Sequence, residues 1–240
     1  MDALSDKKKS QVNIVVIDSG INTSISDLGS YVKKSTGFRL NEHGVVVEEV
    51  GMQAKSEHGS AVALIIRFLC PEARFLSVNI FGNEKSADGR VLLHAFRQAV
   101  AYKPDIINLS LGTTRIRYLF PFERALKTAL DCGIVVVAAA GNDGRKSYPA
   151  YLKGTIGVKS INTEDEDYLH YKNGFYYAPH GFSNVTGADE LRTTAGGNST
   201  AAAYMTGYIG SLMIHRGHNS RNEILKELKA EADKNPIKIS

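Results

Sequence analysis

Apolar runs rich in valine and isoleucine alternate along this chain with segments in which apolar residues recur at helical spacing. That alternation is typical of β-α units built around a parallel sheet. The runs are apolar at almost every position, as strands buried on both faces are. The pattern therefore predicts an α/β fold with strands at Val12–Ile17, Arg74–Phe81, Ile106–Ser110, Ile134–Ala140 and Thr155–Ser160.

The segments with helical spacing predict helices at His58–Leu69, Val91–Tyr102, Pro121–Asp131, Ser199–His215 and Arg221–Ala232. Asn219 and Ser220 stand before the last helix, and either side chain could cap it. The segment Asn41–Met52 alternates weakly between apolar and polar residues, which predicts a hairpin outside the main sheet. Gly82–Gly89 and Gly141–Ser147 are rich in turn-forming residues and are predicted to be surface loops.

The chain shows no internal repeat and no linker-like stretch, so its 240 residues are interpreted as one domain. Hydrophobic residues make up 43% of the chain, which is enough for a sizeable core. Residues 1–11 and 233–240 are expected to be flexible tails. Lys7, Lys8 and Lys9 form the one basic run, which is expected to be solvated.

Charge and composition exclude several classes of function. The net charge of +4 comes without a dominant basic block, so we expect no nucleic-acid partner. No apolar stretch is long enough for a membrane span or a secretory signal, so the chain is interpreted as cytoplasmic, or as the mature fragment of a secreted precursor. We expect no membrane partner and a monomer. Cys70 and Cys132 do not suggest a disulfide framework and are expected to be buried, inert thiols.

Three polar residues stand where predicted strands hand over to predicted helices. Asp18 ends the first strand, His58 opens one helix, and Ser199 opens another after Gly196 and Gly197. A serine hydroxyl becomes an effective nucleophile when an imidazole accepts its proton and a carboxylate orients that imidazole. Taken singly, these residues would be a turn aspartate, a structural histidine and a helix-capping serine. Together, in the order Asp, His, Ser, they predict a catalytic triad.

A fourth polar residue, Asn142, follows the apolar run Ile134–Ala140. Its amide could donate a hydrogen bond to an oxyanion, although an isolated asparagine here would be an ordinary turn residue. The first strand is not followed by the glycine pattern G-x-G-x-x-G, so a Rossmann nucleotide site is not predicted.

These four blocks resemble the motifs of the subtilisin-like serine peptidase family, peptidase family S8. Asp18-Ser19-Gly20 is similar to the family motif D-S/T-G, and residues 58–63 are similar to H-G-T-H-V-A. Residues 197–201 are similar to G-T-S-M-A, and residues 139–142 are similar to A-A-G-N. The resemblance runs from about Val12 to Lys229. It implies a three-layer, doubly wound, mostly parallel sheet with helices on both faces, with Asp18, His58 and Ser199 as the triad and Asn142 in the oxyanion hole.

The resemblance also implies a substrate groove. The block INLSLG is similar to the family segment that lines the pocket for the substrate residue before the cleaved bond and pairs with the substrate backbone. It ends in Ser110, Leu111 and Gly112. The facing wall would be Ala138, Ala139, Ala140 and Gly141, and Gly89 would lie on the opposite edge. A peptide held as an added strand implies an extended peptide or an unfolded protein segment as the partner.

Several positions depart from the family pattern. The calcium-binding loop that many secreted members carry after the histidine helix is missing, so we expect no metal and no cofactor. His215 and His218 are expected to be exposed at a helix end rather than metal ligands. The family's second histidine is replaced by Ala61, the neighbours of the serine are Asn198 and Thr200, and a proline four residues after the serine is replaced by Ala203.

The function predicted from the resemblance is that of a serine endopeptidase, a compact member without signal peptide or propeptide, dedicated to processing a peptide precursor. Two alternatives use the same groove. Extra room beside the acyl-enzyme could admit an amine and give a peptide ligase or cyclase, or the groove could bind a peptide without cleaving it. A small-ligand-binding doubly wound domain is a third alternative, disfavoured by the missing phosphate loop.

Overall fold

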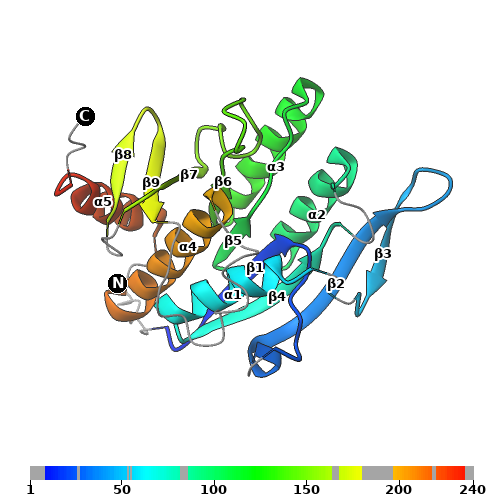
Figure 1. The fold of residues 1–240 in the computed structure, drawn as a ribbon, viewed down its shortest axis with the longest axis horizontal. Coiled ribbons are helices and arrows are strands. Elements are labelled where there is room, and N and C mark those ends of the chain that lie inside the picture. The colour runs from blue at the N-terminus through cyan, green and yellow to red at the C-terminus, as the bar shows by residue number, and fades with distance from the viewer. Residues whose placement is uncertain are drawn as a thin grey trace, which may run out of the picture.

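The computed structural model describes residues 9–25, 28–52, 54, 56–81, 86–163, 168–179, 197–217 and 220–235. Within these residues, nine strands form one sheet in the order β3-β2-β4-β1-β5-β6-β7-β9-β8 (Figure 1). The strands are β1 (Val12–Asp18), β2 (Val32–Leu40), β3 (Val46–Val50), β4 (Ala73–Asn79), β5 (Ile106–Leu109), β6 (Val135–Ala139), β7 (Ile156–Ile161), β8 (His170–Lys172) and β9 (Phe175–Pro179).

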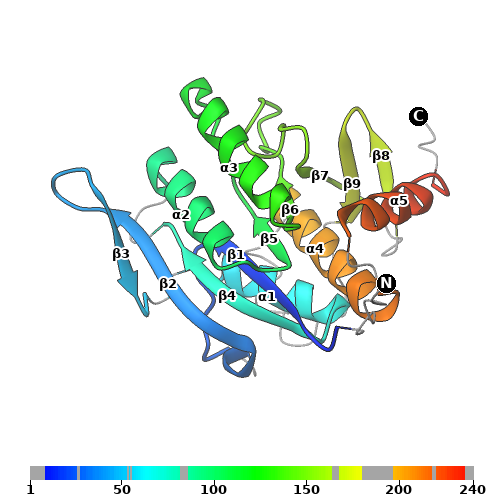
Figure 2. The same cartoon turned by 180° about the vertical axis from the view of Figure 1, so that it is seen from behind.

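The strands from β2 to β9 in this order pair in parallel, whereas the edge strands β3 and β8 pair antiparallel. Helices cover both faces, as Figures 1 and 2 show from opposite sides. The helices are α1 (His58–Leu69), α2 (Gly89–Ala101), α3 (Leu119–Asp131), α4 (Asn198–His215) and α5 (Arg221–Ala232), with short 3₁₀ turns η1 (Leu28–Tyr31) and η2 (Ile116–Tyr118). The predicted fold class, a three-layer and mostly parallel α/β sheet, is confirmed.

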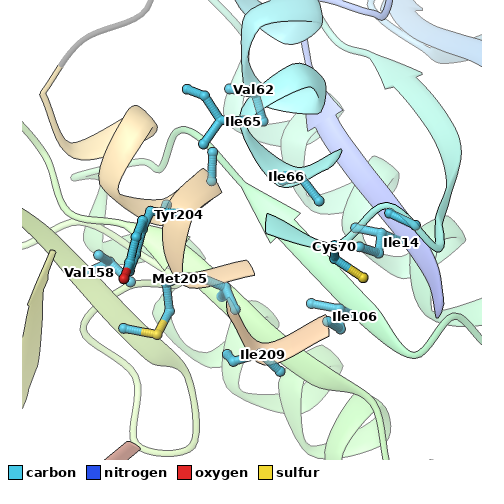
Figure 3. Packing of buried hydrophobic residues seen from close by; sticks show 14 of the residues in the cluster. Ile14, Val62, Ile65, Ile66, Cys70, Ile106, Val158, Tyr204, Met205 and Ile209 are labelled. Carbon is cyan, nitrogen blue, oxygen red and sulfur yellow. The ribbon is translucent and has the colours of Figure 1, made fainter. Parts of the chain in front are cut away.

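The two faces of the sheet bury two separate cores. Along β1, residues 12, 14 and 16 point into a core shared with α1, α4 and α5, while residues 15 and 17 point into a core shared with α2 and α3. This alternation explains why β1 is apolar throughout. Figure 3 shows the first core, which gathers side chains of α1, such as Val62 and Ile66, and of α4, such as Met205 and Ile209.

The predicted strands and helices are all present, and their ends differ from prediction by at most two residues; α1 and α5 have the predicted bounds. Ser220 caps α5 through a capping box with Glu223. Asn219 lies outside the described residues. Strands β2, β8 and β9 were not predicted. Strands β2 and β8 carry polar, exposed side chains and so lack an apolar pattern.

One element was predicted wrongly. The segment Asn41–Met52 was expected to form a hairpin outside the main sheet, but its strand β3 pairs with residues 36–40 of β2, and β2 pairs with β4. The hairpin therefore extends the main sheet at its edge. The backbone groups on the open edge of β4 need partners, and β2 supplies them although its side chains are largely polar.

The two cysteines differ in environment, and both are free thiols. Cys70 is buried, and this burial, followed by the charge of Glu72, raises the pKa of its thiol to about 12. Cys132 is exposed just after α3, so the expectation that both thiols are buried is wrong for Cys132. It follows the last turn of α3, where the chain turns at Gly133 on the surface.

The ends of the described chain can be compared with the predicted tails only in part. Lys9, at the start of the described residues, forms an ion pair with Asp105. Lys7, Lys8 and residues 236–240 lie outside the described residues. Among the helices that the structure describes, none combines the length and the apolar character that crossing a membrane requires.

Candidate active site

The acid and the base of the predicted triad form a hydrogen-bonded pair at the carboxyl end of β1. The Nδ1 atom of His58 lies 2.8 Å from Asp18 Oδ1 and 3.0 Å from Asp18 Oδ2. The Asp18 side chain is 1% exposed and the His58 side chain 27% exposed. Since the carboxylate accepts the Nδ1 proton, the Nε2 atom of His58 is the ring nitrogen left to accept a proton from another group.

Ser19 and Gly59 hold this pair together. The backbone N–H of Ser19 donates to Asp18 Oδ1 at 2.6 Å, and the Ser19 hydroxyl accepts a hydrogen bond from the N–H of Gly59 at 3.1 Å. A Cβ atom on Gly59 would lie 2.3 Å from the carbonyl oxygen of Gly20, so only glycine lets α1 approach β1 this closely. The role of Ser19 was missed in the sequence, where it read only as part of the aspartate motif.

Two effects act on the pKa of His58 in opposite directions. Burial of the ring lowers the pKa, whereas the hydrogen bond and the negative charge of Asp18 raise it. The effect of Asp18 prevails, so the pKa of His58 is raised above its usual value.

Ser199 lies in the first turn of α4 and is 8% exposed. Its hydroxyl donates to the carbonyl oxygen of Ser110 at 2.9 Å. Ser110 follows β5, and Leu109 of β5 pairs with Ile17 of β1, so Ser110 and Asp18 lie level on neighbouring strands. Ser199 therefore lies at the carboxyl ends of the central strands, as the Asp18–His58 pair does. The first N–H groups of α4 have no acceptor within the helix and remain available to an oxyanion.

Asn198, which departs from the family pattern, bridges two strands next to Ser199. Its Nδ2 donates to the carbonyl oxygen of Ala140 at 2.9 Å, and its Oδ1 accepts from the N–H of Ser160 at 2.7 Å. These bonds tie the start of α4 to the ends of β6 and β7. Gly197 precedes it with a φ of 65°, a conformation that favours glycine, and a Cβ there would lie 3.3 Å from Asn142 Oδ1.

A cavity of about 450 Å³ opens beside Ser199. The predicted site residues that line it are Ser110, Leu111, Gly112, Ala140, Gly141, Asn142 and Ser199. The cavity is further lined by Thr113, Thr114, Arg115, Asp143, Arg145 and Ser147. The backbone of Thr113 pairs with that of Tyr148 through two hydrogen bonds. This pairing joins segments far apart in the chain and leaves no local sequence pattern.

Three predicted substrate residues lie elsewhere. Ala138 and Ala139 lie within β6, and their side chains are buried in the two cores. Gly89 opens α2 against Tyr118, whose ring would lie 2.3 Å from a Cβ at this position. The wall of the cavity contributed by this stretch therefore begins at Ala140, and a substrate role for Gly89 stays a prediction.

At the rim of the cavity Asp143 and Arg145 form an ion pair, and Arg115 adds a further positive charge. Arg145 Nε lies 2.6 Å from Asp143 Oδ2, and the hydrogen bonds from Arg145 lower the pKa of Asp143. Among the described residues no cluster of three or more histidine, cysteine, aspartate or glutamate side chains could hold a metal ion. His215 is exposed, and His218 lies outside the described residues.

The fold and the site define an α/β protein that gathers an acid, a histidine and a serine at the carboxyl edge of one parallel sheet. A model of the subtilase family, peptidase S8, matches residues 9–235, and the chain belongs to this family.

The curated relatives are longer proteins. Minor extracellular protease Epr of Bacillus subtilis is 28% identical over 203 residues, which cover 82% of this chain and 28% of Epr. Subtilisin E of the same organism is 32% identical over 176 residues, which cover 65% of this chain and 42% of subtilisin E. This chain thus spans less than half the length of either relative. Among solved structures, the nisin leader peptidase NisP of Lactococcus lactis superposes with a TM-score of 0.69 at 17% identity, covering 91% of this chain and 82% of NisP.

Proposed function

We propose that this protein is a serine endopeptidase that hydrolyses peptide bonds through an acyl-enzyme. The observation that carries the proposal is the Asp18–His58 pair, whose carboxylate is buried and which lies level with the Ser110 carbonyl group that Ser199 contacts. Ser110 and Ser199 both line the cavity. A buried carboxylate bound to Nδ1 is the arrangement that prepares a histidine to act as a general base.

In the proposed mechanism, His58 accepts the proton of the Ser199 hydroxyl as the oxygen attacks the scissile carbonyl. The hydroxyl first has to release the carbonyl oxygen of Ser110 and turn toward Nε2 of His58. Asp18 stabilises the imidazolium that forms. The Ser199 N–H and the Asn142 side chain donate to the oxyanion, the leaving amine takes the proton from His58, and water then hydrolyses the ester.

We further propose that the enzyme processes a peptide precursor and binds an extended segment of it along Ser110–Gly112. These three residues directly follow β5 and line the cavity, which supports backbone pairing with such a segment. NisP, the nisin leader peptidase, has the same fold, which is consistent with this substrate class.

The ligase or cyclase alternative was based on extra room at Ala203. Ala203 is fully buried in the core against α1 and is not among the described residues that line the cavity. It adds no space for an amine at Ser199, and hydrolysis remains the proposed reaction.

The proposal is tested with a peptide library incubated with the wild-type protein and with Ser199→Ala, followed by mass spectrometry. We expect cleaved products that have gained one water molecule, from the wild-type protein alone. Ligated or cyclic products would favour the ligase alternative. If a protein that circular dichroism shows to be folded binds peptides without forming any product, this would favour the alternative in which the groove binds a peptide without cleaving it.

A further inference from the structure

A second cavity, of about 570 Å³, lies behind the wall of the first. The stretch 145–150 separates the two, because Arg145 and Ser147 line the first cavity while Lys146 and Ala150 line the second. On its other side the second cavity is lined by residues of the β8–β9 hairpin and by Arg221 and Leu225 of α5.

The charges that line the second cavity have one sign. Lys146, Lys153 and Arg221 contribute three cations, and no aspartate or glutamate is among the described lining residues. Lys146 and Lys153 are exposed, and neither forms an ion pair with a described carboxylate. The cavity therefore presents a positive potential to whatever enters it.

Arg221 is the most buried of these cations. Its Nη2 donates to the carbonyl oxygen of Gly154 at 3.0 Å, but its Nε is buried and has no partner among the described residues. The hydroxyl of Thr155, which lines the same cavity, is likewise buried without a partner in that part of the chain. Burial lowers the pKa of Arg221, as expected for a guanidinium without a counter-ion. A partly buried cation of this kind gains most from a carboxylate that enters beside it.

Aromatic side chains make up a large part of the remaining lining. Tyr171, Phe175 and Tyr176 line the cavity, and burial raises the pKa of the Tyr176 hydroxyl to about 12. The combination suits a peptide that carries both carboxylates and apolar side chains better than a small anion, which would leave most of this volume empty.

We propose that this second cavity binds a carboxylate-bearing segment of the peptide substrate that lies outside the cleaved bond. The inference rests on the proposed function for the identity of the ligand as a substrate. It adds a second recognition site, which would select acidic precursors by binding them at two places at once.

Binding can be measured without catalysis. The probes are two fluorescein-labelled peptides, one of alternating glutamate and tyrosine and one of alternating glutamine and tyrosine, titrated into Ser199→Ala and followed by fluorescence anisotropy. We expect the glutamate peptide to bind more tightly, and its affinity to fall about tenfold in Ser199→Ala/Arg221→Gln, because charge-assisted hydrogen bonds are lost. Lys153 is exposed, so its replacement should not affect folding. The affinity of Ser199→Ala/Lys153→Gln for the glutamate peptide should therefore also be reduced, which keeps the test valid if the Arg221 variant is unstable.

Lys229→Gln is the matched control, since it removes one exposed charge from the same helix, α5, outside the cavity. It should leave the affinity for the glutamate peptide unchanged. Equal binding of the two peptides, or equal losses in the Lys153 and Lys229 variants, would overturn the proposal.

A cleavage assay separates this inference from the proposed function. A peptide that the wild-type protein cleaves is extended with a glutamate tail or with a glutamine tail, and the ratio of kcat/KM for the two is compared between the wild-type protein and Lys153→Gln. A preference for the acidic tail that disappears in the variant supports the second site. Cleavage of both at equal rates would overturn the second site and leave the endopeptidase intact, whereas tight binding without cleavage would contradict the endopeptidase alone.

Discussion

At the scale of single residues, the chemistry of His58 is set by its contact with Asp18. The carboxylate lies within 3.0 Å of Nδ1 through both oxygens and is almost completely removed from water. It therefore fixes which ring nitrogen carries the proton and compensates for the burial of the ring. A change at either residue should alter catalysis far more than it alters the fold.

Asp18→Asn should preserve the structure and lower kcat by about 10⁴-fold, as the same change does in other proteases with a Ser-His-Asp triad. The amide cannot stabilise an imidazolium and favours the wrong tautomer. Steady-state kinetics on a cleaved peptide would measure the effect, with circular dichroism as the control for folding. A loss of less than tenfold in a folded variant would contradict the role of Asp18.

The pH profile should report the raised pKa of His58. His58 acts as a base only when neutral, so kcat/KM should rise as the pH increases through this pKa and be lost in acid. In Asp18→Asn the inflection should move to lower pH, because burial, which lowers the pKa, then acts unopposed. Unchanged inflection points in the two proteins would contradict this account.

The same contact affects stability with a defined sign. The folded-state pKa of His58 is raised, so its interaction with Asp18 contributes fully below the unfolded-state pKa and is lost as the pH rises through the folded-state pKa. Chemical denaturation of Ser199→Ala across this range should therefore show a contribution that declines toward higher pH and is missing when Asp18 is also replaced by asparagine. A difference between the two that does not vary with pH would argue against the coupling.

At the scale of elements, the position of Ser199 depends on how α4 is attached to the sheet. Asn198 makes this attachment through the two hydrogen bonds to Ala140 and Ser160, one to each of two adjacent strands. Because it uses both its donor and its acceptor, no residue without an amide side chain reproduces the arrangement.

Asn198→Ala should lower the free energy of unfolding by about 1–3 kcal/mol, since it leaves a carbonyl and an N–H of the sheet without partners. Activity should fall as well, because the start of α4 is no longer held. Urea denaturation and kinetics would measure the two effects. Asn198→Asp keeps the acceptor for the Ser160 N–H and loses the donor to Ala140. Its free energy of unfolding should therefore lie between those of the wild-type protein and Asn198→Ala. Wild-type stability in Asn198→Ala would show that the bridge is not needed.

At the scale of the whole molecule, His58 and Ser199 are carried by two helices, α1 and α4, that pack directly on one another. A Cβ atom on Gly207 would lie 2.8 Å from Leu69 Cβ and 2.9 Å from the carbonyl oxygen of Ile66. On Gly210, one turn further, the nearest atom would be Cys70 Sγ at 3.0 Å. The first contact allows no adjustment without moving a backbone, whereas the second involves the end of a side chain.

Gly207→Ala should therefore destabilise the protein, because overpacking costs about 1–3 kcal/mol and exceeds the gain in helix propensity of about 1 kcal/mol. Gly210→Ala is the matched change, and there the two effects should nearly cancel. Urea denaturation of both variants tests the comparison. Kinetics should show reduced kcat for Gly207→Ala, since separating α1 from α4 separates His58 from Ser199. Equal stability of the two variants would contradict the close packing.

The parts of this molecule that the sequence could predict are those that each element encodes locally. The buried parallel strands and the helices have continuous or periodic apolar patterns, and Asp18, His58 and Ser199 stand in recognisable motifs at their ends. Strand β2 and the bridge made by Asn198 could not be predicted in this way. Each is formed by contacts between segments far apart in the chain, and such contacts leave no local pattern.

The most direct test of the central claim is covalent labelling of Ser199. A fluorophosphonate reacts with a serine hydroxyl only when a neighbouring base and an oxyanion site activate it. The account predicts a single adduct, located at Ser199 by mass spectrometry, that is absent in Ser199→Ala and strongly reduced when His58 is replaced by alanine. A folded wild-type protein that forms no adduct, or an adduct at another serine, would contradict it.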